Sequence, residues 1–492
     1  MLTGREHEPG LTVEHFYAIA AEARPAEIDV ALARFAAAAR IRSPIAIGLR
    51  AMKSVTSGDL AAGIALLKRA VAHSSGPVRQ YLLELLVPLL INTHHIADAQ
   101  EALDAVDDSV FELAPAFAAS RAIVEARQGN DTASAWFARE ALATGRGVDN
   151  PMIVGRVLTR TAFAAFYRED FDEAQDRALE AARWFDRIES HRNAATAYSI
   201  LYIIAHDWLC DPDVARFYAR RMTMSARLAE DASLENLGLV SQIDIAAEAG
   251  DSRRLASLRA RLVANPLHEQ YHERFTYTIA VVLAHGWAGQ FELARVTLTA
   301  LRNRSGLSLS ERSLCDALLA ITALSTWHTD LARRTARRNI SQTAERSGKE
   351  PLFDTRRRRV ARILAAAVCA VLGDTVRARR ALSRAFDPEQ RFASIIDSGG
   401  MDEDRVPLMM RGYARFLNQA CRSANLVRPS HGLTEAEVEV LKALPAGMTL
   451  AVIASSLGKS RKTVERQVGN IYAKLNVANR AQAIQRARDL GL

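Results

Sequence analysis

The stretch LTEAEVEVLKALPAGMTLAVIASSLGKSRKTVERQVGNIYAKLNVANRAQAIQRARDLGL, residues 433–492, decides the fold of the C-terminal part of this chain. It contains four short helical patterns, and Gly447 and Gly458 end the first two, because glycine readily adopts the backbone conformation of a helix end. Four residues stand where a side-chain oxygen can cap the first turn of a helix: Thr434, Thr449, Ser460 and Asn479. Thr434 and Glu437 together form a capping box. The stretch therefore predicts a compact four-helix unit.

The third of these helices has two faces of opposite character. Apolar side chains at helical spacing form one face, at Val464, Val468, Ile471 and Leu475. The opposite face carries Lys462, Arg466, Gly469 and Ala473, with Glu465 and Asn470 beside it. An arginine can donate two hydrogen bonds to a guanine edge, a glutamate can accept one from cytosine, and small residues let a helix approach the bases. This pattern predicts a helix that reads the major groove of DNA.

Further contacts are expected around this helix. Its N-terminus offers free backbone amides and the positive end of the helix dipole to a phosphate, next to three basic side chains. The predicted DNA contacts are Lys459, Ser460, Arg461, Lys462, Thr463, Glu465, Arg466, Gly469, Asn470 and Lys474. The fourth helix carries a short apolar strip, Ala483, Ile484 and Ala487, which we expect to find no partner within so small a domain. A second copy of the chain is expected to cover this strip.

Taken together, these motifs resemble the LuxR-type helix-turn-helix over about an eighth of the chain. The resemblance rests on Leu433-Thr434-x-x-Glu437-x-Glu439-Val440-Leu441, Ile453-Ala454-x-x-Leu457, Ser460-x-Lys462-Thr463-Val464, Asn470-Ile471-x-x-Lys474-Leu475 and Asn479-Arg480. It implies transcription regulation, dimerisation through the fourth helix, base contacts at Glu465, Arg466 and Gly469, and phosphate contacts at Lys462 and its neighbours. The family usually has an aliphatic residue at Lys459, a basic one at Glu465 and histidine at Gln467.

The composition limits what the remaining residues can be. Of 492 residues, 49% are hydrophobic, so the chain can bury one extended core or several compact ones, and its net charge of +8 favours a polyanionic partner. The four cysteines form no CxxC pair, which predicts reduced thiols. No secretory leader at Met1–Glu6 and no bilayer-spanning apolar run is visible, so we expect a soluble, cytoplasmic protein that does not associate with membranes.

Residues 1–421 alternate amphipathic helical patterns with short breaks, and no convincing strand pattern is visible, so an all-α region is predicted. The breaks recur at roughly 35 to 45 residues, the period of stacked helical hairpins. They are Ser57-Gly58-Asp59, His94-His95, Gly129-Asn130-Asp131, Glu169-Asp170, Asp211-Pro212, Gly250-Asp251, Gly289-Gln290, Trp327-His328 and Gly373-Asp374. Alanines that let paired helices close on each other follow these breaks: Ala99, Ala174, Ala215, Ala294, Ala332 and Ala378.

This region resembles a tetratricopeptide-type α-solenoid of about nine hairpins. A curved stack of this kind presents a long concave groove to a peptide, a helix or a small ligand. We therefore predict a sensor or partner-binding domain at 1–421, a linker at 422–432 and the DNA-binding domain at 433–492. The alternative is that the solenoid is a rigid spacer or a dimerisation arm. The whole chain resembles the C-terminal half of large ATP-binding LuxR regulators without the ATPase.

Two motifs favour an enzyme and must be weighed against the residues around them. His268-Glu269-x-x-His272 has the spacing of a zinc-peptidase helix, with Glu292 as a candidate third ligand, but no strand edge for a peptide substrate is visible. Gly458-Lys459-Ser460 is similar to the end of a phosphate-binding loop, but Ile453 stands where that loop needs glycine. We therefore expect no catalysis, no cofactor and no metal, and we keep a zinc-dependent peptidase as an alternative function.

Arginines are concentrated between residues 330 and 386. The side chains of Arg356 to Arg359 point to all sides of one helix, so at least one is expected to face a neighbouring helix. A buried arginine needs a carboxylate partner, and Asp354 and Glu350 are close in sequence. The others are predicted to form a solvated face or a second surface for DNA backbone or an acidic partner. The tryptophans are predicted to lie in the core between repeats: Trp136, Trp184, Trp208, Trp287 and Trp327.

The sequence thus predicts a sequence-specific transcription regulator, with activation expected over repression. A ligand or partner protein in the solenoid groove is expected to change how two terminal domains meet DNA. The expected partners are double-stranded DNA, a second copy of the chain at least on DNA, an effector in the groove, and RNA polymerase. A second alternative to a regulator is an interaction scaffold whose terminal domain docks protein instead of DNA.

Overall fold

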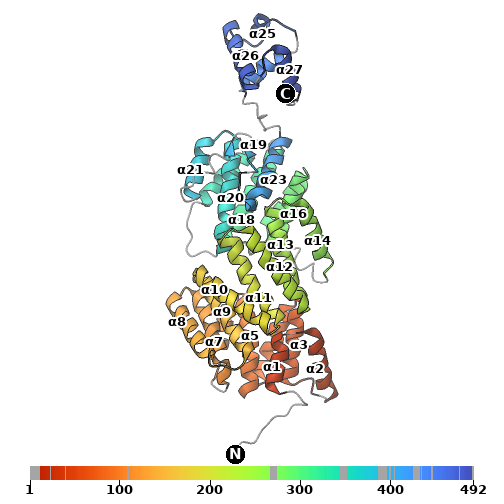
Figure 1. Ribbon diagram of the computed structural model, residues 1–492, viewed down its shortest axis with the longest axis vertical. Coiled ribbons are helices and arrows are strands. Elements are labelled where there is room, and N and C mark those ends of the chain that lie inside the picture. Colours follow the sequence, from red (N-terminus) through yellow and green to blue (C-terminus); the bar gives the residue numbers. More distant parts are fainter. Residues whose placement is uncertain are drawn as a thin grey trace, which may run out of the picture.

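The structure is a computed structural model that describes residues 12–489, except 23, 39, 108–109, 266–273, 327, 344–351, 386–395, 398–399, 404, 425–432, 434, 445–446 and 476. Helices make up most of the described chain, and they stand in antiparallel pairs that stack along one axis (Figure 1). The all-α prediction misses one small feature. Ile396–Asp397 (β1) and Gly400–Met401 (β2) form a short antiparallel pair, with Ile396 opposite Met401.

The elements follow one another in a regular order along the chain. The paired helices are α1 (Val13–Glu22) with α2 (Pro25–Ala37), α3 (Pro44–Thr56) with α4 (Leu60–Ala72), α5 (Gly76–Asn92) with α6 (Ile96–Asp104), α7 (Ala114–Gln128) with α8 (Asp131–Gly145), α9 (Pro151–Tyr167) with α10 (Phe171–Arg187), α11 (His191–Ile203) with α12 (Pro212–Leu228), α13 (Ala232–Glu248) with α14 (Ser252–Val263), α16 (Phe275–Trp287) with α17 (Phe291–Arg302), α18 (Leu309–Ser325) with α19 (Thr329–Gln342), and α20 (Leu352–Val371) with α21 (Thr375–Ala385). The remaining elements are the 3₁₀ turns η1 (Phe111–Leu113) and η3 (Leu408–Met410), the π-helical turn η2 (Ile204–Trp208), and α23 (Arg411–Ser423), α24 (Glu435–Ala443), α25 (Leu450–Ser456), α26 (Arg461–Leu475) and α27 (Arg480–Asp489).

Each predicted break, as far as its residues are described, falls at the turn between the two helices of a pair. These turns place one residue in the left-handed region. Where that residue is glycine, φ lies between +71° and +86°, at Gly58, Gly129, Gly250, Gly289 and Gly373. His94 and Glu169 reach +66° and Cys210 reaches +51° in the same place. The turn therefore needs a residue in the left-handed conformation but not necessarily glycine. Breaks without glycine are for this reason harder to recognise in the sequence.

The positions after these breaks are small because the paired helices touch there. The predicted alanines are at most 3% exposed: Ala99, Ala174, Ala215, Ala294, Ala332 and Ala378. In the pair α3–α4, Gly63 stands at the position that alanine takes in these other pairs. A Cβ atom on Gly63 would come within 2.6 Å of Val55 Cγ2. In these pairs, the distance between the two helices is thus limited by one small residue, as the sequence predicts.

The prediction for the tryptophans is wrong for two of them. Trp136 is 53% exposed and Trp208 is 50% exposed, so about half of each side chain remains open to solvent. The ring of Trp208, for example, packs 4.4 Å from that of Phe171, centre to centre. Trp287 is half-buried and donates a hydrogen bond from Nε1 to the Gly412 carbonyl at 2.9 Å. Trp327 lies outside the described residues.

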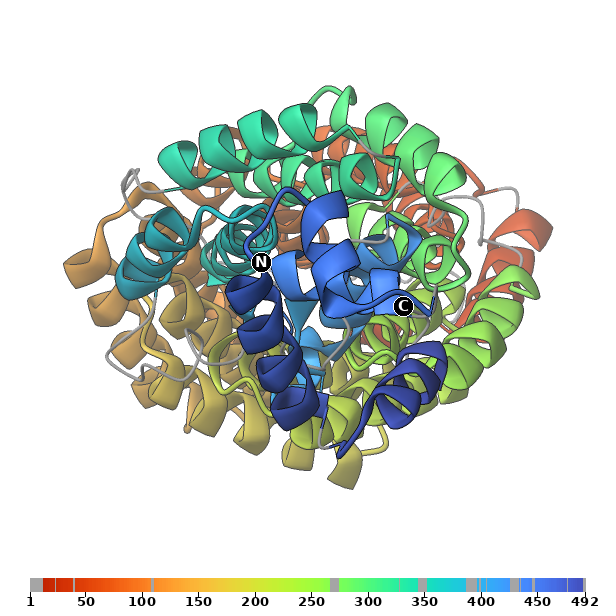
Figure 2. The same cartoon turned by 90° about the horizontal axis from the view of Figure 1, so that it is seen from above.

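The N-terminal half of the stack closes on itself around a buried ion cluster. Helix α1 packs against both α5 and α11, so the inner helices surround the axis (Figure 2). Glu84 on α5 is completely buried and accepts hydrogen bonds from Arg156 and Arg160 on α9. Arg156 also donates to the Tyr17 hydroxyl of α1 at 3.0 Å. Burial by itself raises the pKa of the Glu84 carboxyl, but the two guanidinium groups outweigh it and hold the pKa below its usual value.

The C-terminal half of the stack is filled by the chain's own helix α23, which packs against the inner helices α13, α16 and α18. Two glycines show how closely it fits. A Cβ atom on Gly286 would lie 1.8 Å from Phe416 Cδ2, and one on Gly412 would lie 1.9 Å from the Ala247 carbonyl oxygen. The expectation of one long open groove is therefore wrong, because half of the concave surface already has an occupant.

The domain limits predicted at 421 and 433 stay predictions. Helix α23 continues to Ser423, and residues 425–432 of the predicted linker lie outside the described residues. Helices α24–α27 have a hydrophobic core of their own. Among the described helices, none combines the length and the apolarity that crossing a bilayer requires.

Replacing Glu84 by Gln is expected to lower the free energy of unfolding by about 3–5 kcal/mol, because two buried guanidinium groups lose their charged partner. The pH dependence has a definite sign. Since folding lowers the pKa of Glu84, its carboxylate stabilises the native state above the unfolded pKa, and this contribution is lost as the pH falls through the folded pKa. E84Q should therefore lose less stability on acidification than the wild type.

Thermal unfolding followed by circular dichroism between neutral and acidic pH measures both effects. Glu180→Gln is the matched control, since the Glu180 side chain is 57% exposed in a surface pair with Arg177 and its loss should cost no more than about 1 kcal/mol. Equal melting temperatures for E84Q and the wild type at neutral pH would contradict the structural role of the cluster.

Candidate nucleic-acid interface

Helix α26 is the centre of the C-terminal unit and packs against α24, α25 and α27. The apolar stripe predicted for it is buried, with Val464 and Ile471 at 0% exposure. The core around it consists of Leu433, Val440, Leu441, Leu444, Ile453, Ala454, Val464, Val468, Ile471, Leu475, Ala483 and Ala487. One side of α26 is thereby anchored, and the other side is left to solvent.

The helix starts follow the predicted caps. The backbone amide of Val452 donates to Thr449 Oγ1 at 3.4 Å, that of Thr463 to Ser460 Oγ at 3.1 Å, and that of Gln482 to Asn479 Oδ1 at 2.9 Å. Thr434 lies outside the described residues, so the predicted capping box with Glu437 stays a prediction. The turns between the helices use the predicted glycines in the left-handed region, with φ of +72° at Gly447 and +63° at Gly458.

The solvent side of α26 carries the side chains predicted to face DNA. The exposed residues on it are Lys462, Glu465, Arg466, Gly469, Asn470 and Ala473. A Cβ atom on Gly469 would meet nothing within 4 Å, so this point of the helix surface is open. No hydrogen bond or ion pair joins Lys462 or Arg466 to another described residue. Both cations are therefore available to an external anion.

Two of the predicted phosphate contacts are engaged within the domain. Lys459 is only 20% exposed at its side chain, and its Nζ atom donates to Glu439 Oε2 at 2.9 Å. Lys474 donates to Glu437 Oε2 at 2.7 Å, and Glu437 is buried. Both lysines thus connect α24 to the region of α26. The half-buried site of Lys459 is consistent with the aliphatic residue that the LuxR-type pattern usually has there.

The charge on the exposed face is also partly balanced internally. Arg461 Nε donates to Glu465 Oε1 at 2.8 Å, one helical turn along α26. Both side chains are exposed, so the pair is weak and can be exchanged for contacts to another molecule. A base contact by Glu465 requires that exchange, whereas one by Arg466 does not.

The expected partnerless strip on α27 is a wrong prediction. Ala483 is 0% exposed and Ala487 is 7% exposed, and Ile484 is half-buried, because α27 packs against α24 and α26. The strip covers the core of its own domain rather than a second copy. A dimer formed through α27 would have to use its exposed side, which includes Ala481 and Arg486.

Sequence reasoning also missed the role of Arg480. Its guanidinium donates to the Leu444 carbonyl from Nε at 3.1 Å and to the Met448 carbonyl from Nη1 at 2.7 Å. These bonds tie the start of α27 to the end of α24 and the turn that follows. The motif Asn479-Arg480 was the only signal in the sequence, and it shows the cap but not the distant acceptors.

Comparison with known proteins agrees with this architecture. Residues 431–487 match the family described as bacterial regulatory proteins, luxR family. The C-terminal unit is a LuxR-type helix-turn-helix domain. In this domain α25 and α26 form the helix-turn-helix, and α24 and α27 support it.

Two curated relatives are similar to a short part of the chain. The transcriptional regulatory protein DegU of Brevibacillus brevis is 32% identical over 84 residues, which is 15% of this chain and 36% of DegU. The probable transcriptional regulatory protein SgaR of Hyphomicrobium methylovorum is 46% identical over 56 residues, which is 11% of this chain and 26% of SgaR. The chain thus spans about a third or less of these relatives.

A solved structure is similar to this chain over most of its length. It is a signal transduction ATPase with numerous domains and a tetratricopeptide repeat sensor, from Pyrococcus horikoshii. The match has a TM-score of 0.37 and 14% identity, over 77% of this chain and 53% of that one.

The residues weighed for a zinc peptidase are not brought together as a described site. His268 and His272 lie outside the described residues. Glu292 lies on the surface of α17 in an ion pair with Arg295, whose hydrogen bond lowers the pKa of the Glu292 carboxyl. The candidate third ligand is therefore already engaged by a neighbour on its own helix.

Substitutions of Gly469 distinguish an effect on the stability of the domain from an effect on how closely α26 can approach DNA. Gly469→Ala should stabilise the free domain by about 1 kcal/mol, because alanine is the better helix former and its Cβ atom meets nothing. Gly469→Leu should also leave the free domain folded, but its bulk should lower DNA affinity on the order of tenfold if the helix lies close to the bases. Melting curves and fluorescence anisotropy with labelled duplex measure the two effects, with Ala as the size control. Wild-type affinity in G469L would exclude close approach at this position.

Proposed function

We propose that this protein is a sequence-specific transcription regulator in which the helical repeats control DNA binding by the C-terminal domain. The observation that carries the proposal is the exposed face of α26, where Lys462 and Arg466 stand beside the open surface at Gly469. A helix with this face fits the major groove, and the buried stripe behind it fixes its orientation. The similarity to DegU and SgaR, which are described as transcriptional regulatory proteins, supports the same role.

On DNA, each cation has a distinct role in this proposal. Arg466 lies near the middle of the exposed face and donates in a fork to a guanine edge. Lys462 lies in the first turn of α26 and neutralises a phosphate together with the free amides there. Two copies bind half-sites about one duplex turn apart, through the exposed side of α27, and the regulator activates transcription by contacting RNA polymerase.

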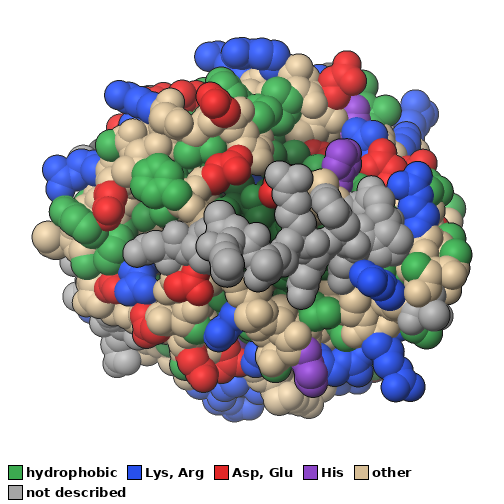
Figure 3. Space-filling model, turned by 90° about the horizontal axis from the view of Figure 1, so that it is seen from below, with side chains coloured by type: hydrophobic (Ala, Val, Ile, Leu, Met, Phe, Trp, Pro, Cys, Tyr) green, Lys and Arg blue, Asp and Glu red, His purple; other side chains and the backbone are tan. Residues whose placement is uncertain are grey.

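For the sensing role, the inner surface of the N-terminal half offers a cavity of about 420 Å³ between the inner helices. Seen from the N-terminal end, the molecule is hollowed near its centre (Figure 3). The volume is in the range of small-molecule sites. Since α23 occupies the C-terminal half, this cavity is the part of the concave surface that we assign to the effector.

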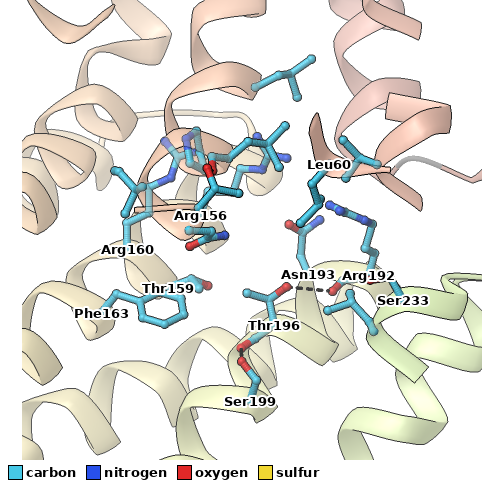
Figure 4. A pocket seen from close by; sticks show the side chains of 18 of the residues that line it. Leu60, Arg156, Thr159, Arg160, Phe163, Arg192, Asn193, Thr196, Ser199 and Ser233 are labelled. Carbon is cyan, nitrogen blue, oxygen red and sulfur yellow. Dashed lines mark hydrogen bonds between the residues drawn. The ribbon is translucent and has the colours of Figure 1, made fainter. Parts of the chain in front are cut away.

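The cavity lining favours a small polar effector. Residues of α9 and α11 face each other across it, including Thr159, Thr196 and Ser199 (Figure 4). Each of these hydroxyls donates its proton to a carbonyl of its own helix, at 3.0, 3.3 and 2.7 Å respectively. Their oxygens are therefore hydrogen-bond acceptors toward the cavity. The guanidinium groups of Arg156 and Arg160 also line the cavity, but they already donate to Glu84 and to neighbouring acceptors. An effector that donates hydrogen bonds matches this lining.

The effector signal has a direct route to the DNA-binding domain. Helix α23 lies within the repeats and is followed by residues 425–432 and then by α24. A change in the curvature of the inner helices alters the surface against which α23 packs. This change in turn alters how two C-terminal domains are positioned relative to DNA. Differential affinity of the effector for the two arrangements is what drives the switch.

Replacing Arg466 and Lys462 separately by Ala tests DNA recognition by the full-length protein. R466A should cost about 1–3 kcal/mol at one base position and relax the preference there. K462A should weaken binding to all sequences alike and reduce the dependence of log affinity on log salt by about one contact. Selection from a random duplex library and titrations at several salt concentrations measure both.

Arg216→Ala is the control for both variants, because Arg216 lies in a surface pair on α12, outside the C-terminal domain. Its binding should equal that of the wild type. If the full-length protein shows no salt-dependent affinity for any duplex, the regulator proposal fails and the scaffold alternative takes its place. An unchanged sequence preference in R466A would remove Arg466 from the set of readers.

Filling the cavity tests the sensing role. Thr196→Leu adds apolar volume where the proposal puts the effector, so DNA binding by T196L should no longer respond to the dialysable fraction of a cell extract that changes wild-type binding. Thr144→Leu is the matched control, because Thr144 makes the same kind of hydrogen bond to its own helix on an exposed surface. A response in T196L equal to that of the wild type would place the effector elsewhere.

A further inference from the structure

A second group of charges lies on the axis of the stack, at the level of α11, α13 and α20. Arg356 on α20 confirms the prediction that one arginine of the run 356–359 faces its neighbours and meets a carboxylate. Its partners are Glu248, at 2.5 Å, and Asp207, at 3.3 Å. The predicted partners, Glu350 and the side chain of Asp354, lie outside the described part of the chain. Arg357 pairs separately with Glu311 at 3.1 Å.

His206 lies at the centre of this group, because the π-helical turn η2 places it there. A π-helical turn is rare and is frequently found at functional sites. His206 is 3% exposed, and its ring nitrogens contact different carboxylates. Nδ1 lies 2.8 Å from Asp207 Oδ1, and Nε2 lies 3.0 Å from Glu248 Oε2 and 3.8 Å from Asp244 Oδ2.

We propose that His206, Asp244 and Glu248 bind a divalent transition-metal ion. One ligand atom from each residue lies within 4.8 Å of the other two, which is the separation that a shared ion requires. Asp244 and Glu248 are one turn apart on α13, so one helix face supplies both carboxylates. One imidazole and two carboxylates are a suitable set for Zn²⁺, with the fourth position left to water from the adjoining cavity.

The surroundings of His206 are those of a metal ligand. A histidine that binds metal through one nitrogen usually donates from the other to a carboxylate, which fixes its tautomer, and Asp207 provides this acceptor. Arg356 leaves the lone pair of Nε2 accessible. Its Nη1 atom is 3.1 Å from Nδ1 and 3.2 Å from Nε2. In the ring plane, a position this close to both nitrogens would collide with ring carbon atoms, so the guanidinium lies over the face of the ring.

The charges balance when the ion is bound. When His206 is neutral, as a metal ligand must be, the three carboxylates of Asp207, Asp244 and Glu248 face one guanidinium, that of Arg356. This leaves two negative charges in a buried site. Arg274 is exposed at the rim of the cavity. A divalent ion neutralises this excess completely.

The site joins parts of the chain that are far apart in sequence. It connects η2, α13 and α20, and the segment before the DNA-binding domain lies directly on it. Met409 Sδ is 3.7 Å from Arg356 Nη2, and Tyr413 of α23 lines the same cavity. A bound ion therefore holds together the elements on which α23 is seated.

Zinc binding by the full-length protein, first freed of metal by chelation, tests the proposal. Isothermal titration should show one high-affinity equivalent of Zn²⁺, and Zn²⁺ should raise the melting temperature. Asp244→Asn keeps the shape of the side chain and should weaken binding by at least tenfold. Asp213→Asn is the matched control, because the Asp213 side chain is 80% exposed on the neighbouring α12 and its variant should bind as the wild type does.

Two further arms distinguish this site from the other candidate zinc ligands. The double variant His268→Gln/His272→Gln should keep the high-affinity equivalent, and its loss there would overturn the proposal. Co²⁺ bound to the wild type should show weak visible bands without a thiolate charge-transfer band, because the proposed ligands include no cysteine. This spectrum tests the ligand set even if D244N fails to fold. A thiolate band, no stoichiometric binding, or equal affinity in D244N and the wild type would also overturn it.

Discussion

The burial of one face of α26 is the constraint on which the interpretation of the C-terminal domain depends. Val464, Val468, Ile471 and Leu475 enter the core shared with α24, α25 and α27. Because these residues repeat at helical spacing, fixing them fixes the opposite face as well, and that face is where Lys462 and Arg466 stand. The ion pairs of Lys459 and Lys474 with α24 reinforce the same orientation. The helix presents its cations because its apolar side leaves it no other position.

Local patterns were sufficient for much of this structure. The caps at Thr449, Ser460 and Asn479 and the turns between paired helices depend on residues within one or two turns of the chain, and the sequence predicts them. Arg356 shows the limit of such reasoning. Its run predicts that a buried carboxylate is needed, but the Glu248 partner is 108 residues away in sequence and no local pattern identifies it. Nothing local specifies which helices the superhelix brings together.

The errors in prediction have one common cause, which is packing between segments distant in sequence. The strip on α27 was judged to lack a partner because its contacts with α24 and α26 are not visible from the strip alone. The concave surface was expected to be open because a repeat pattern does not reveal that a later helix fills it. Glycines such as Gly286 and Gly412 are a local trace of that helix, since each leaves room that Phe416 or the Ala247 carbonyl takes up.

A solenoid with charges on its axis behaves differently from one with an open groove. Glu84 with Arg156 and Arg160 ties α5 to α9 near the centre of one half, and Arg356 with Glu248 ties α20 to α13 near the centre of the other. Buried ion pairs of this kind hold only when every partner is in place, so a change in curvature breaks or remakes several contacts at once. Helix α23 lies beside the second cluster through Tyr413 and is followed along the chain by α24, so the cluster, α23 and the C-terminal domain succeed one another in the fold.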